Sequence, residues 1–195
     1  MDSFLFCLLL VIAIALGGRD QLIVAQLSDA LAKGKAQDMR RPVPVLALGL
    51  ASAALTAGAM AYGGALVAEI LPRRAALMLV ALALAFAAFE LAWPVRLKRV
   101  NEPTRSVPAI ALVLLWRQIG DAARFAIFAF AAAATYPLTA WIGGALGGAL
   151  AVTVGWTLGF EQLSRWPLRW LRRGFAAALF IAATFIGLTA RYGAI

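Results

Sequence analysis

The chain contains no histidine, one cysteine and few acidic residues. Histidine is the commonest transition-metal ligand and the commonest general base, so its absence excludes a histidine-based metal centre or catalytic dyad. The single Cys7 excludes an intramolecular disulfide. The sequence also has no hydrolase triad, no set of thiolate ligands and no nucleotide-binding loop. We therefore expect neither an enzyme nor a tightly bound cofactor.

Charged residues of both signs are scarce as well. Of the 195 residues, 64% are hydrophobic and 14% are charged, and the mean hydropathy is +0.88. Soluble domains have roughly 45–50% apolar and about 25% charged residues, so a soluble domain of this length is excluded. The composition predicts an all-α integral membrane protein whose main partner is the lipid bilayer.

Basic residues outnumber acidic ones, 18 to 9. They stand in short clusters between apolar runs and lack the interleaved aromatic residues of an RNA-binding surface. Lipid headgroups and membrane topology account for such clusters. We therefore expect no nucleic-acid partner.

Six apolar stretches are long enough to cross a bilayer, which takes about 20 helical residues. They lie at 4–27, 43–66, 75–94, 109–133, 137–159 and 174–192. The first stretch has no basic start, and no small-residue cleavage site precedes a soluble domain. We expect it to be a retained helix and not a signal peptide.

The distribution of Lys and Arg orients the six predicted spans. Twelve basic residues lie in the first, third and fifth connections, whereas three lie on the opposite side. The twelve are Lys33, Lys35, Arg40, Arg41, Arg96, Lys98, Arg99, Arg105, Arg165, Arg169, Arg172 and Arg173, and the three are Arg73, Arg74 and Arg191. The positive-inside rule then predicts that these three connections lie in the cytoplasm and both termini outside. We expect the membrane to be the inner (plasma) membrane of the cell.

The single membrane domain divides into two similar halves, residues 1–100 and 101–195. IALGGRDQLIVAQLS aligns with RQIGDAARFAIFAFA so that Gly17 pairs with Gly120, an offset of 103. Further along each half, RRPVPVLALGLASAAL aligns with TYPLTAWIGGALGGAL at an offset of 95. Three spans is an odd number, so the second half is inverted relative to the first.

Inverted repeats with polar, glycine-interrupted helices at corresponding positions are typical of secondary transporters with a site near the membrane midplane. The alternative is a chance similarity between helices that are rich in Ala and Gly.

Gln118-Ile119-Gly120-Asp121 in the second half, and Gly17, Arg19 and Gln21 in the first, follow one motif. This motif resembles Glu-x-Gly-Asp-(Lys/Arg)-(Thr/Ser), which opens each half of the GDT family of cation–proton exchangers. The family includes the Golgi-type manganese and calcium transporters. The resemblance extends over essentially the whole chain.

The resemblance implies a divalent-cation/proton antiporter, with Mn²⁺ or Ca²⁺ as the transported ion. It implies helix breaks at Gly17, Gly18 and Gly120, and Asp121 and Gln118 as metal ligands. The ion and proton pathway would consist of Asp121, Gln118, Asp20, Gln21, Arg19, Arg117 and Arg124.

Three of the family's four motif carboxylates are replaced here. The four positions are Ala15, Gly18, Gln118 and Asp121, so one carboxylate remains. This leaves open a degenerate member that no longer transports and acts as a structural partner or as half of a heterodimer with a similar six-helix protein. For the assembly of the chain, a homodimer stays open as well. The intramembrane arginines leave a third possibility, export of another solute such as an amino acid or an anion.

The polar residues of the motif helices have structural interpretations too. Asp121 is either a cation ligand or the centre of an ion pair with Arg117 at i−4 and Arg124 at i+3. Asp20 faces away from the position of Gly18 unless the two glycines break the helix. For Glu90, near the end of the third span, we expect snorkelling toward the membrane interface.

The glycine-rich stretch of the fifth span has small residues at helical spacing. We expect it to form a close helix-packing face. The glycines concerned are Gly143, Gly144, Gly147 and Gly148.

Overall fold

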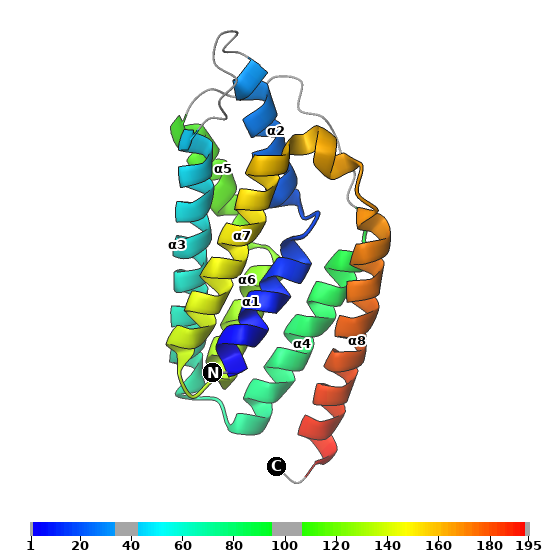
Figure 1. Cartoon of the computed structure of the whole chain (residues 1–195). Coiled ribbons are helices and arrows are strands. Elements are labelled where there is room, and N and C mark those ends of the chain that lie inside the picture. Colours follow the sequence, from blue (N-terminus) through cyan, green and yellow to red (C-terminus); the bar gives the residue numbers. More distant parts are fainter. Residues whose placement is uncertain (1, 34–42, 95–106, 194–195) are drawn as a thin grey trace.

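The computed structural model of the chain describes residues 2–33, 43–94 and 107–193, and every regular element in this part is an α-helix (Figure 1). The helices are α1 (Asp2–Ala15), α2 (Arg19–Lys33), α3 (Val43–Ala68), α4 (Arg73–Ala92), α5 (Val107–Ile119), α6 (Ala122–Ala133), α7 (Pro137–Ser164) and α8 (Leu168–Tyr192). The predicted all-α class is confirmed for these residues. Most of the basic residues expected in the first and third connections lie outside the described part.

Four of the described helices, α3, α4, α7 and α8, are long and apolar enough to cross a membrane. A fifth span results if α1 and α2, which are bent by 62° at their junction, count as one. These helices support a multi-pass membrane protein. The sequence predicts one continuous span over 109–133, but the structure divides this stretch into α5 and α6, of 13 and 12 residues. Neither helix is long enough to cross a membrane alone.

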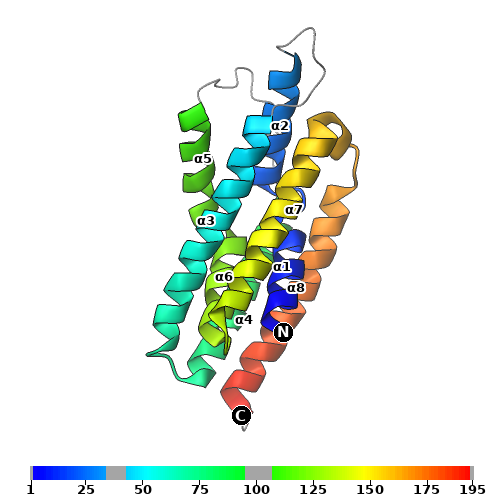
Figure 2. The same ribbon diagram turned by 60° about the vertical axis from the view of Figure 1, so that its left-hand side comes forward.

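Many of the helix ends lie toward one of two opposite poles of the bundle. The C-terminal end of α2, the N-terminal ends of α3 and α5 and the α7–α8 turn lie toward one pole (Figure 1). The α3–α4 and α6–α7 turns and the described ends of the chain lie toward the other, and Figure 2 shows the same division from the side. Large apolar side chains such as Phe180, Ile181 and Phe185 project outward from α8, as lipid-facing residues do.

The central helix α7 packs against α1, α2 and α3, while α6 packs against α3 and α4, and α4 packs against α8. One stripe of α7 has small residues at every fourth position: Gly143, Gly147, Ala151, Gly155 and Gly159. A Cβ at Gly147 would lie 2.8 Å from the backbone oxygen of Leu8, and one at Gly155 would lie 2.7 Å from that of Gln21. The predicted packing face is confirmed: small residues let the backbones approach closely.

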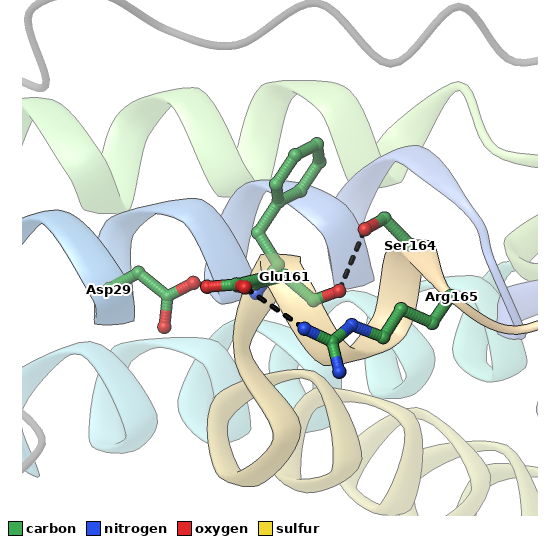
Figure 3. Close-up of polar contacts among 5 residues, drawn as sticks. Asp29, Glu161, Ser164 and Arg165 are labelled. Carbon is green, nitrogen blue, oxygen red and sulfur yellow. Dashed lines mark hydrogen bonds and ion pairs between the residues drawn. The ribbon is translucent and has the colours of Figure 1, made fainter.

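The stripe ends at a kink in α7. Gly159 has a φ of +72°, in the left-handed region that glycine adopts at little cost. The backbone N–H of Phe160 then donates to a carboxylate oxygen of Asp29 at 2.8 Å, which ties α2 to the last turn of α7. Figure 3 shows Asp29 pointing toward the turn that carries Glu161, and Arg165 reaching back to Glu161 in an exposed ion pair of 3.1 Å.

A polar cavity at two helix breaks

The first break separates α1 from α2. Gly17 has a φ of +65°, and its N–H donates to Oε1 of Gln21 at 2.7 Å. The amide nitrogen of Gln21 donates to the backbone oxygen of Ala151 on α7 at 3.0 Å. The helix breaks predicted at Gly17 and Gly18 are confirmed, and the side chain of Gln21 replaces part of the interrupted backbone hydrogen bonding.

The second break separates α5 from α6 at Gly120 and Asp121. Asp121 is the N-cap residue of α6 and has extended backbone angles, φ −84° and ψ 140°. The first N–H of α6, on Ala122, donates to Oε2 of Glu90 at 3.0 Å. The snorkelling expected for Glu90 is therefore wrong, because the carboxylate satisfies a donor that the break leaves without a helical partner.

Both breaks open onto one cavity of about 790 Å³. All seven predicted pathway residues line it: Arg19, Asp20, Gln21, Arg117, Gln118, Asp121 and Arg124. Asp20 reaches the cavity because the bend at Gly17 turns α2 relative to α1. Glu90 and Arg172 line it as well, and sequence analysis placed neither of them in the site.

A buried hydrogen-bond network joins α3 to the second break. Nε of Arg124 donates to the hydroxyl oxygen of Thr56 at 2.7 Å. The same hydroxyl lies 2.9 Å from Oε1 of Gln118, whose amide nitrogen donates to Ser52 at 3.2 Å. Gln118 and Arg124 are 1% and 3% exposed, so both depend on these partners in place of water.

The helical ion pair proposed for Asp121 is not present. Among the residues that the structure describes, the guanidinium nitrogens of the cavity arginines lie more than 4.0 Å from the carboxylate oxygens of the cavity. The ion pair found in this part of the chain, Arg165–Glu161, lies outside the cavity. The reason is the break at Gly120, which interrupts the i−4 register between Arg117 and Asp121. Arg124 is held by Thr56 instead.

The cavity brings together three carboxylates, from Asp20, Glu90 and Asp121. Within the described ranges, no three Asp, Glu or Cys side chains are grouped closely enough to hold a metal ion. The side-chain oxygen of Gln118, a proposed metal ligand, faces the Thr56 hydroxyl. Binding of a divalent cation at Asp121 and Gln118 therefore requires that these side chains leave their present partners.

Arg172, predicted in a cytoplasmic connection, is instead a buried residue of α8. Its Nη1 donates to the backbone oxygen of Leu16 at 3.2 Å and its Nη2 to that of Glu90 at 3.1 Å. The arginine thus satisfies carbonyl groups at the C-terminal ends of α1 and α4. The cluster WPLRWLRR predicts an interfacial segment and does not reveal which of its arginines turns inward.

No protein-family model, curated protein sequence or solved structure matches the chain.

Proposed function

We propose that the chain is a secondary transporter and a divergent member of the GDT family, with the cavity at the two helix breaks as its solute site. The observation that carries this proposal is the opening of both broken helices onto one polar cavity in an otherwise apolar bundle. Broken helices present unpaired backbone groups and helix ends to a solute, and they are tolerated at membrane depth where they line a cavity.

Equivalent contacts in the two halves support an inverted repeat of residues 1–100 and 101–195. The offset of 103 pairs Gln21 with Arg124, and the offset of 95 pairs Thr56 with Ala151. Gln21 donates to Ala151, and Arg124 donates to Thr56. Exchanging the halves therefore converts one contact into the other, as a pseudo-twofold axis requires.

A second pair supports the same axis. A Cβ at Gly148 would lie 3.2 Å from Cβ of Ala53, and the offset of 95 relates these two residues to each other. A contact between a residue and its own counterpart lies at the axis. In this arrangement α1–α2 and α5–α6 each form one crossing, which gives six in total.

The transported solute that the family resemblance implies is Mn²⁺ or Ca²⁺, exchanged for protons. Asp121 would act as cation ligand and proton carrier, and Asp20 and Glu90 would supply the oxygen donors that the motif lacks. The alternative is a degenerate, non-transporting member that serves as a structural partner or as half of a heterodimer. The lack of a group of three metal-binding side chains in the described part favours this alternative.

The experiment is a flux measurement in proteoliposomes with an imposed pH gradient. We expect uptake of Mn²⁺ or Ca²⁺ with counter-movement of protons, and we expect Asp121→Asn to abolish it. Glu161→Gln, which removes an exposed carboxylate outside the cavity, is the matched control and should leave flux unchanged. An absence of both ion and proton movement in the wild type would contradict the exchanger and favour the structural partner.

A further inference from the structure

We propose that the cavity contains a binding site for an oxyanion, the carboxylate or phosphate group of a small solute, between the guanidinium of Arg124 and the N-terminus of α2. This inference rests on the proposed function in one respect, that the cavity is reached by solutes. It does not depend on transport of a divalent cation.

Arg124 is the first element of this site. The side chain is 3% exposed, and Nε donates to Thr56. In the described part of the chain, Nη1 and Nη2 have no hydrogen-bond acceptor, although the residue lines the cavity. A buried guanidinium with one edge fixed and the other edge unused is suited to bidentate recognition of carboxylate or phosphate.

The guanidinium of Arg124 lies against Gly148 of α7. A Cβ at that position would lie 3.5 Å from Nη2 and 3.6 Å from Nη1, which is ordinary van der Waals contact. The glycine therefore places no side chain over the terminal nitrogens, and α7 forms the wall of the cavity beside them.

The N-terminus of α2 is the second element. Arg19, Asp20 and Gln21 line the cavity, and in the part of the chain that the structure describes, their backbone N–H groups have no hydrogen-bond acceptor. Unpaired N–H groups and the helix dipole make such an end favourable for an anion. Gln21 also bonds to Ala151, one turn along α7 from Gly148, so the helix end and Arg124 face the same part of the cavity.

The N-terminus of α6 is the counterpart of the N-terminus of α2 in the second half, and it indicates which chemical group such a helix end binds. The N-terminus of α6 receives a carboxylate oxygen of Glu90, from the last helix of the first half. The last helix of the second half, α8, contains no Asp or Glu. The chain thus fills one of two related helix ends with its own carboxylate and leaves the other for a carboxylate or phosphate from outside.

The charge of the cavity favours an anion over a cation. Four guanidinium groups line it, against three carboxylates. Asp20 is the internal competitor, because it lies in the first turn of α2 and interacts with Arg124. Removing its charge should therefore strengthen anion binding, whereas the same change should weaken binding of a divalent cation.

The experiment is calorimetric titration of the purified full chain in nanodiscs with succinate and, separately, with inorganic phosphate. We expect saturable binding of at least one of the two. Arg124→Lys keeps the positive charge and loses the planar edge, and it should weaken binding about ten-fold. Asp20→Asn should strengthen it several-fold. Arg165→Gln removes an exposed positive charge outside the cavity and should have no effect.

Each outcome decides the proposal. Binding of succinate alone identifies a carboxylate solute, and binding of both identifies a general oxyanion site. No binding, or binding that neither Arg124→Lys nor Asp20→Asn alters, overturns it. If Arg124→Lys does not fold, Asp20→Asn alone still tests the proposal. An oxyanion site predicts tighter anion binding in that variant, and unchanged or weaker anion binding overturns the site. Cation flux without anion binding would remove this inference and leave the exchanger intact, whereas anion binding without cation flux would do the reverse.

Discussion

The hydroxyl of Thr56 joins Arg124 to Gln118. It accepts from Nε of the arginine at 2.7 Å and lies 2.9 Å from the amide oxygen of the glutamine. A single oxygen on an unbroken helix, α3, thus holds residues from both sides of the second break. This group helps to fix the relative position of α5 and α6, together with the bonds from Gln118 to Ser52 and from the N–H of Ala122 to Glu90.

Thr56→Val tests this dependence, because it keeps the shape of the side chain and removes the hydroxyl. Arg124 and Gln118 are then left with unpaired buried polar groups, so we expect a loss of stability of about 1–3 kcal/mol. Thermal unfolding in detergent measures it. Thr153→Val is the control, since within the described residues its hydroxyl bonds to the backbone oxygen of Ala149 in its own helix and to no other helix. Equal effects of the two changes would contradict a joining role for Thr56.

Gly155→Ala tests the close approach of α2 to α7. The added Cβ would lie 2.7 Å from the backbone oxygen of Gln21 and 2.9 Å from its Cγ. We expect α2 to be displaced and stability to fall by about 1–3 kcal/mol. Gly174→Ala on α8 is the control: nothing lies within 4 Å of that position, so it should be neutral or stabilise by up to about 1 kcal/mol.

Membrane topology is tested by single cysteines in a Cys7→Ala background. Ile70 lies in the α3–α4 turn and is 78% exposed, whereas Arg165 lies at the opposite pole and its side chain is 75% exposed. We expect a membrane-impermeant maleimide added to intact cells to label Ile70→Cys and to leave Arg165→Cys unlabelled. Labelling of both from outside would refute a membrane crossing between them, and the reverse pattern would invert the predicted orientation.

Sequence analysis predicted the helix breaks and the motif residues of the cavity because these depend on local chemistry. Glycine next to polar residues inside an apolar run leaves few alternatives to an interrupted helix. The resemblance to the GDT motif and the helical spacing predicted one pathway for Gln118, Asp121 and Arg124, and all three line the cavity. The division of 109–133 into two short helices follows from the break at Gly120, although the length of the apolar run predicted one span.

The partners of the motif residues could not be predicted, because they depend on how neighbouring helices are rotated. The apolar residues of α3 are spread around its whole circumference, so its sequence does not single out the side on which Ser52 and Thr56 face the second break. Glu90 did carry a usable signal, since an acidic residue within an apolar span indicates a functional site by default. Arg172 carried none, because it is one of several similar arginines in a row.

The small-residue stripe of α7 has a mechanical consequence. Interlocking side chains hold packed helices in register, because ridges of one must climb over ridges of the other before either can shift lengthwise. Along 143–159 the side of α7 that faces α1 and α2 has no ridges above a methyl group. Lengthwise displacement of α1 and α2 along this side of α7 therefore meets no large α7 side chain. The hydrogen bonds that Gln21, Ser28 and Asp29 make with the α7 backbone then fix the lengthwise register of α2.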